Sequence, residues 1–171
     1  MSSRALFLLP AVPALVLQAQ ESAIPGAMEV HPGIFVLRGA PDDQTCVAIK
    51  KQRITHVLDL RRDGEPSLNC ESENIRMQEM GIQYVRYAIG RTPPAGDFDF
   101  LRGYFKELPR GAKVLVHCNN GNRAAAAVCP WLILDKGLSL EEGLKVARMA
   151  GLQHADTEAA IRSYVSARKA G

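Results

Sequence analysis

This sequence of 171 residues has little net charge, few aromatic residues and no apolar run long enough to cross a membrane. A formal net charge of +3 is too small to indicate binding to nucleic acid or to a membrane surface. The longest largely apolar run spans residues 5–17, whereas a transmembrane helix needs roughly 20 residues. There is no repeat and no low-complexity tract. With 47% apolar and 23% charged residues, the chain has the composition of one compact globular domain, and its weak positive charge suits a small anionic ligand.

The histidines and cysteines are too scattered to predict a metal site. The histidines lie at positions 31, 56, 117 and 154, and no Cys/His pair has the short spacing that zinc sites use. We therefore expect neither a metal nor a cofactor. Cys129 falls in the helix expected after Cys118 and is expected to be a core residue. Cys46 and Cys70 can pair with one another, protect Cys118 as a resolving thiol, or pack as free thiols.

The first 19 residues have the organisation of a cleavable signal peptide. Arg4 precedes the apolar run, and Gln18-Ala19 could end a cleavage site before a polar segment. We expect export, which in a bacterium with two membranes means the periplasm, and no stable membrane association after processing. This interpretation divides the chain into a signal peptide at 1–19, a linker at 20–27 and a catalytic domain at 28–171. The oligomeric state cannot be predicted from the sequence.

The rest of the sequence alternates between strand-like and helix-like segments. The run from Ile54 to Leu60 is almost continuously apolar, which is typical of a strand buried on both faces. We expect an α/β fold with a mostly parallel central sheet flanked by helices, in which ligands bind at the carboxyl ends of the strands. The expected strands are 34–38, 54–60, 82–89 and 113–117, and the expected helices are 43–52, 70–80, 98–108, 123–136, 139–149 and 155–168.

The most informative segment joins the strand 113–117 to the helix that follows it. Cys118 ends the strand, Arg123 opens the helix, and the polar sequence Asn119-Asn120-Gly121-Asn122 lies between them. Loop amides and the first turn of a helix together bind anions, because their N–H groups lack partners and the helix dipole favours negative charge. A cysteine beside a guanidinium in such a pocket is expected to be largely a thiolate, and the arginine can hold an oxyanion with two donors. We interpret Cys118 as a nucleophile.

The four residues between Cys118 and Arg123 are expected to form the anion site. Gly121 and the three asparagines are residues that adopt the positive-φ or bridge conformations needed by a phosphate-sized ring of amides. An ordinary Asn-Gly turn is the alternative, but it accounts for neither the cysteine nor the arginine beside it. We expect His117 to orient the loop by hydrogen bonding.

The loop resembles the active-site loop of the cysteine-dependent protein phosphatases, His-Cys-x-x-Gly-x-x-Arg, shortened by one residue. The chain is most similar to the bacterial beta-lactamase-hydrolase-like, phosphatase-like family, whose Cys-x-x-Gly-Asn-Arg pattern is matched by Gly121-Asn122-Arg123. Segments 33–41 and 54–61 resemble further parts of that family, and the likeness spans about residues 28 to 155. It implies the three-layer fold of tyrosine and dual-specificity phosphatases.

The resemblance implies hydrolysis of a phosphate monoester through a phosphocysteine, with weak activity on aryl phosphates. Ala124 stands where these phosphatases usually place Ser or Thr, and the four-residue enclosure has the length found in rhodanese-type sulfurtransferases. A sulfurtransferase that forms a Cys118 persulfide is therefore an alternative. A second alternative is a module that binds an anion or phospho-ligand, or senses redox state, without turnover.

Two further parts of the sequence carry weaker functional hypotheses. The Pro/Gly-rich stretch 90–99 contains Asp97, which is either a general acid or the N-cap of the next helix. Arg61 and Asp63 follow the strand 54–60, so they open at the same edge of the sheet as Cys118. They are candidates for a charged rim that selects the substrate, or else form an ordinary solvated ion pair.

Overall fold

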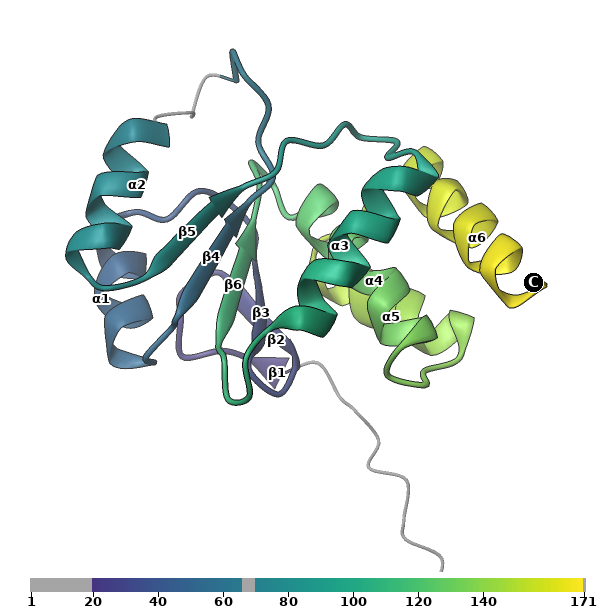
Figure 1. Cartoon of the computed structure of the whole chain (residues 1–171), viewed down its shortest axis with the longest axis horizontal. Coiled ribbons are helices and arrows are strands. Elements are labelled where there is room, and N and C mark those ends of the chain that lie inside the picture. Colours follow the sequence, from purple (N-terminus) through teal and green to yellow (C-terminus); the bar gives the residue numbers. More distant parts are fainter. Residues whose placement is uncertain (1–19, 66–69, 171) are drawn as a thin grey trace, which may run out of the picture.

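The computed structural model describes residues 20–65 and 70–170, which form a six-stranded sheet between two layers of helices (Figure 1). The strands β3, β6, β4 and β5 pair in parallel, whereas β1, β2 and β3 form an antiparallel extension. This confirms an α/β fold with a mostly parallel central sheet. In spatial order, the strands are β1 (Gln20–Glu21), β2 (Ala27–His31), β3 (Ile34–Leu37), β6 (Val114–His117), β4 (His56–Asp59) and β5 (Gln83–Arg86).

The helices cover both faces of the sheet, as Figure 1 shows. The helices α1 (Asp43–Lys51) and α2 (Cys70–Glu79) lie on one face. The other face carries α3 (Ala95–Glu107), α4 (Asn122–Leu134), α5 (Leu140–Ala150) and α6 (Ala155–Lys169). Successive strand side chains point to opposite faces, so Phe35 and Leu37 pack under α1 and α2 while Val36 joins the core beneath α4. Burial on both faces explains why these strands read as continuous apolar runs.

Capping residues fix several helix ends where the sequence places them. Asp42 caps α1 by accepting a 2.7 Å hydrogen bond from the Thr45 amide, and Ser139 forms a reciprocal capping box with Glu142 at the start of α5. The expectation that Asp97 caps α3 is wrong. The cap position is occupied by Pro94, and Asp97 lies inside the first turn, because the helix begins two residues earlier at Ala95.

The N-terminal part of the domain differs from expectation. Residues 20–27 were expected to be a linker, but they contain β1 and the first residue of β2, and Ile24 is completely buried in the core between the sheet and α1. The pairing of β1 with β2 and of β2 with β3, together with the burial of Ile24, makes this segment part of the folded domain. The expected signal peptide at 1–19 lies outside the described residues. Across residues 20–65 and 70–170, no helix has both the length and the apolar content required to cross a membrane.

The cysteines that the structure describes are free thiols. Cys129 is completely buried in α4, and this burial raises its pKa to about 12, as expected for a core residue without chemistry. Cys46 is buried in α1, with its sulfur 3.6 Å from the Arg76 Nη1 atom of α2. Cys70 begins α2, but its side chain lies outside the described part of the chain, and Cys46 carries an unpaired sulfur.

Candidate active site

The loops that follow β4, β5 and β6 gather at the carboxyl edge of the parallel strands (Figure 1). A pocket of about 330 Å³ opens there. This is the edge at which open α/β sheets bind their ligands, and it is where the sequence places the site. The pocket is lined by Arg62, Glu65, Arg91, Asn119, Asn120, Asn122, Arg123 and His154.

Gly121 allows the Cys118 loop to turn into α4. Its φ is +85°, and a Cβ atom there would lie 3.1 Å from the Ala150 carbonyl oxygen and 3.2 Å from Arg38 Cγ. Only glycine meets both demands at low cost. The asparagines do not share this role as expected, because Arg53 is the one non-glycine residue with positive φ among the residues described. Gly121 therefore supplies the positive φ of this turn, and none of the three asparagines does.

Cys118 is not itself part of the pocket lining, but it is next in the chain to Asn119 and contacts Asn120, and both of these residues line the pocket. It follows β6 and is completely buried, as is Ala124 in the first turn of α4. The Asn120 side chain lies over the sulfur: its Oδ1 atom is 3.8 Å from Cys118 Sγ and accepts a 3.2 Å hydrogen bond from the Asn122 amide. The sulfur is therefore covered by its own loop, at the point where the N-terminus of α4 favours negative charge.

The Asn122 side chain holds the loop in place, although the residue also lines the pocket. It is buried, and its Oδ1 atom accepts hydrogen bonds from the amides of Gln153 and His154 at 3.0 and 3.1 Å. Its Nδ2 atom donates to Thr157 Oγ1 at 3.0 Å. Asn122 therefore ties the Cys118 loop to the connection between α5 and α6, while the exposed Asn119 and Asn120 are left to face the pocket.

The Arg123 guanidinium is held by a carboxylate that sequence analysis did not single out. Its Nη1 and Nη2 atoms lie 2.6 and 2.7 Å from the two oxygens of Glu65, a bidentate pair. Nη1 also donates to the carbonyl oxygens of Leu60 and Ile89, both at 3.2 Å. These partners come from the segments after β4 and β5, so two neighbouring strand ends fix the orientation of the guanidinium.

The electrostatics of this pair are strongly coupled. Hydrogen bonds from Arg123 are the main reason that the pKa of Glu65 falls to about 2, so its carboxylate is ionised at neutral pH. The same contact raises the pKa of Arg123, and the charge of the Cys118 sulfur adds to that rise. Asn119 Nδ2 also donates to Glu65. Sulfur, guanidinium and carboxylate therefore form one interacting group at the base of the pocket.

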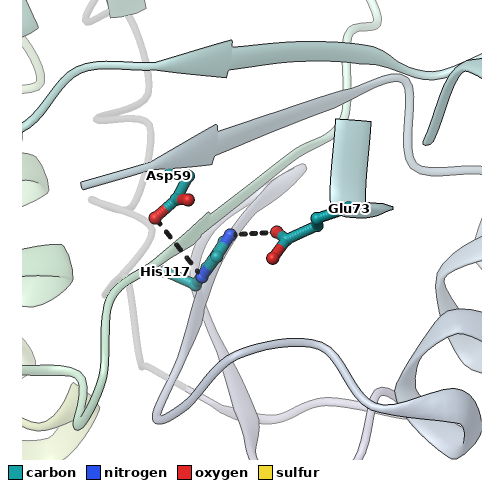
Figure 2. Close-up of side chains that lie close together, drawn as sticks. All are labelled: Asp59, Glu73 and His117. Carbon is teal, nitrogen blue, oxygen red and sulfur yellow. Dashed lines mark ion pairs between the residues drawn. The ribbon is translucent and has the colours of Figure 1, made fainter. Parts of the chain in front are cut away.

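The His117 ring lies between the carboxylates of Asp59 and Glu73 (Figure 2). Its Nε2 atom lies 2.8 Å from Glu73 Oε1, and its Nδ1 atom lies 3.9 Å from Asp59 Oδ1. Neither contact has the direction of a hydrogen bond, so both act as ion pairs when the ring is protonated. The ring is completely buried next to Cys118, and its role in orienting the loop remains a prediction.

Asp59, Glu73 and His117 also have ligand atoms within 4.8 Å of one another, a spacing that could hold a metal ion. However, the buried Arg61 guanidinium contacts both carboxylates and binds Asp59 with two atoms, at 2.7 and 2.9 Å. Burial alone would raise the pKa of Asp59, but these hydrogen bonds and the charge of His117 outweigh it and lower the pKa. The positive charge beside these carboxylates is the Arg61 guanidinium rather than a metal ion. We therefore interpret the cluster as a structural network of ion pairs.

The expected rim residues lie elsewhere. Arg61 is completely buried because it follows Asp59 by two residues in an extended segment and so points to the same side, toward α2. Asp63 is exposed and pairs with Arg86 at 2.8 Å, away from the residues that line the pocket. The charged rim is formed instead by Arg62 and Arg91.

The structure does not bring Asp97 to the pocket. Its Oδ1 atom accepts a 3.0 Å hydrogen bond from Tyr87 Oη, and it is not among the residues that line the pocket. His154, by contrast, lines the pocket but was only one of four scattered histidines in the sequence. His154 lies at the pocket because the connection between α5 and α6 packs against the Cys118 loop. No local sequence pattern predicts that long-range contact.

Solved structures share this fold. No protein-family model matches the chain, and no curated protein matches it in sequence. A phosphatase-type DUF442 protein from Shewanella putrefaciens is 17% identical, with a TM-score of 0.68 over 84% of this chain and 93% of that one. PTPMT1 in complex with PI(5)P is 15% identical, with a TM-score of 0.70 over 85% and 97% of the two chains. TpbA from P. aeruginosa, a Cys-to-Ser variant in complex with pTyr, is 15% identical, with a TM-score of 0.65 over 90% and 91%.

These similarities cover nearly the whole described domain. The chain therefore has the fold of tyrosine and dual-specificity phosphatases, with six strands flanked by six helices among the residues described. At identities of 15–17% the likeness applies to the fold. The chemistry has to be argued from the residues of this chain.

Proposed function

We propose that the protein is a cysteine-dependent hydrolase of phosphate monoesters that acts through a phosphocysteine. The observation that carries this proposal is the Cys118 loop, in which a buried sulfur and the N-terminus of α4 lie close to the carboxylate-held Arg123, which lines the pocket. A phosphoryl group carries its charge on oxygens that loop amides and a guanidinium can bind together. Cys118 attacks phosphorus, and Arg123 and the amides hold the oxygens until water completes hydrolysis.

The ligand class follows from the charges of the pocket. Arg62, Arg91 and Arg123 line it and exceed the single carboxylate of Glu65, so a negatively charged group is attracted. A volume of about 330 Å³ accommodates a phosphate with a small organic group attached. The phosphorylated ligands bound by TpbA and PTPMT1 support a phosphorylated substrate here as well.

A sulfurtransferase is the second candidate, and the four residues between Cys118 and Arg123 favour it. A shorter loop makes a tighter ring of amides, in which a persulfide on Cys118 fits more easily than a phosphoryl transition state. Arg123 would then hold thiosulfate or a similar anion. The buried Ala124 supplies no hydroxyl to assist departure of phosphate from the sulfur.

One pair of assays separates these functions. The purified protein is tested with p-nitrophenyl phosphate and, separately, with thiosulfate plus cyanide. We expect turnover of the aryl phosphate, loss of that turnover in Cys118→Ser, and little change in the control Cys46→Ser, whose sulfur lies under α2. Turnover of thiosulfate alone would overturn the phosphatase proposal, and activity on neither substrate would favour a binding module.

We also propose that the protein is exported and processed near residue 19. The basic residue and apolar run at the N-terminus motivate this proposal. N-terminal sequencing of the protein recovered from a periplasmic extract should give a chain that begins near Gln20. Recovery of the intact chain from the cytoplasmic fraction would contradict export.

A further inference from the structure

The proposed hydrolysis needs a proton donor for the leaving oxygen, and Asp97 does not lie at the pocket. Among the residues that line the described part of the pocket, the three arginines keep their protons and the three asparagines do not titrate. Glu65 has lost its proton at neutral pH because Arg123 lowers its pKa to about 2. The remaining lining residue is His154, and histidine is the side chain that exchanges a proton between pH 5 and 8.

His154 is fixed to the Cys118 loop by direct contacts. The backbone amide of His154 donates to Asn122 Oδ1 at 3.1 Å, and Asn122 is the residue before Arg123. Gly151, three residues earlier, packs against the same loop so closely that a Cβ atom would lie 3.2 Å from Gly121 Cα. The connection between α5 and α6 is therefore built against the loop that carries the nucleophile.

A second set of contacts fixes the opposite side of the pocket to the same connection. The buried Thr157 hydroxyl accepts from Asn122 Nδ2 at 3.0 Å and donates to the carbonyl oxygen of Arg91 at 2.7 Å. The Arg91 side chain in turn pairs with Asp156 at 2.8 Å. These contacts hold Arg91, the connection between α5 and α6, and the Cys118 loop together around His154.

The charges that face His154 come from several elements. Asp156 lies two residues along in α6, Arg91 precedes α3, and Arg62, Glu65 and Arg123 line the same pocket. Desolvation would raise the pKa of Asp156, but the Thr157 amide and the charges of Arg91 and His154 lower it on balance. The His154 ring is therefore within electrostatic reach of the Asp156 carboxylate.

We propose that His154 is the catalytic acid and base of this site, in the phosphate-ester hydrolysis proposed above. In the first step the Cys118 thiolate forms a bond to phosphorus, the phosphorus–oxygen bond to the leaving group breaks, and that oxygen takes the electron pair and a proton from the His154 imidazolium. In the second step neutral His154 takes a proton from water as the water oxygen bonds to phosphorus. The sulfur–phosphorus bond then breaks, which releases inorganic phosphate and restores the thiolate and the imidazolium.

The test compares two aryl phosphates that differ in their need for an acid. p-Nitrophenolate leaves readily without a proton, whereas phenolate does not. For His154→Gln we expect kcat to fall about 100-fold on phenyl phosphate, the lower end of the usual contribution of general-acid catalysis, and by less than about threefold on p-nitrophenyl phosphate. The decline of kcat with rising pH on phenyl phosphate should also disappear. His56→Gln, at the amino end of β4, is the matched control and should match the wild type.

The outcomes separate the role of His154 from the proposed function. An equal fall on both substrates would mean that His154 acts only as a structural residue, and no change on either would also overturn the inference while leaving the phosphatase function intact. Failure of the wild type to hydrolyse both substrates would overturn the function and this role with it. His154→Asn serves as a second variant, and the thermal midpoint of each variant verifies that it is folded.

Discussion

At the scale of single residues, the contact between Arg123 and Glu65 decides how the site is arranged. An arginine that must bind an anion needs a fixed orientation, and a bidentate carboxylate on one edge of the guanidinium supplies it. The Glu65 side chain is only 12% exposed, so solvent screens this pair less than an ordinary surface ion pair. Glu65 is therefore a positioning residue for Arg123 and also a source of stability.

Replacing Glu65 by Gln gives a pH-dependent prediction. Because Arg123 depresses the pKa of Glu65 from 4.5 to about 2 in the folded state, the stabilisation is complete above about pH 4.5 and is lost as pH falls toward 2. We expect Glu65→Gln to lower the free energy of unfolding at pH 7 by on the order of 2 kcal/mol, with a much smaller difference near pH 2.5. Urea unfolding of both proteins at the two pH values measures this.

The control for that experiment is Glu107→Gln, an exposed position at the end of α3. It should change the free energy of unfolding by less than about 0.5 kcal/mol at either pH. A Glu65→Gln difference that is the same at pH 7 and near pH 2.5 would show that the carboxylate charge contributes nothing to the pair.

Sequence analysis finds those site residues that are neighbours in the chain. Cys118 and Arg123 belong to one strand–loop–helix motif, so their meeting at one pocket follows from local geometry alone. Glu65 and His154 are 58 and 31 positions from Arg123 in the sequence. They line the same pocket because two other loops fold back to it. The expectation that Arg61 and Asp63 form the rim of the site was wrong for a related reason. Packing across the sheet decides which side of this extended segment faces α2, and the Arg61 side chain lies on that side.

At the scale of elements, Gly121 joins β6 to α4 and sets the shape of the Cys118 loop. Gly121→Ala must adopt φ near +85° and also place a Cβ atom 3.1 Å from the Ala150 carbonyl oxygen. Gly137, after α4, has a similar φ of +81°, but a Cβ atom added there would meet no other atom within 4 Å. The two alanine variants therefore share the conformational cost of about 1 kcal/mol and differ in the steric cost.

We expect Gly121→Ala to lower the free energy of unfolding by at least about 1 kcal/mol more than Gly137→Ala does, and to abolish turnover of p-nitrophenyl phosphate. Urea unfolding and the activity assay on both variants test this. Equal destabilisation, with activity retained in Gly121→Ala, would mean that the loop tolerates a side chain and that the close approach is unimportant.

Elements with strong local signals were predicted well, and those stabilised by pairing were missed. The strand expected at 54–60 and the helices expected at 70–80 and 139–149 carry such local patterns, and the structure has β4, α2 and α5 there. The strand β2 has only five residues and no regular alternation of burial, and β1 has two exposed residues. β2 exists because it pairs with β3, and β1 because it pairs with β2, and such pairing leaves little trace in the sequence.

At the scale of the whole molecule, the sheet brings separate loops to one edge. The parallel strands β4, β5 and β6 run in the same direction, so the segments after them deliver Glu65, the carbonyl of Ile89 and Cys118 to a common pocket (Figure 1). The helical layer of α4, α5 and α6 then closes the far side through Asn122 and Thr157. The fold thus explains why the Cys118 loop, Glu65 and His154 lie at one pocket although they are distant in the chain.

The most direct test of the central claim compares the alkylation of Cys118 by iodoacetate and by iodoacetamide at pH 6, with Cys118→Ser as the blank for the other thiols. An ionised sulfur in an anion pocket should react faster with the negatively charged reagent, and inorganic phosphate should protect it from both. If Cys118 reacts more slowly with iodoacetate than with iodoacetamide, and phosphate gives no protection, the loop is not an anion-binding site around a thiolate and the account is contradicted.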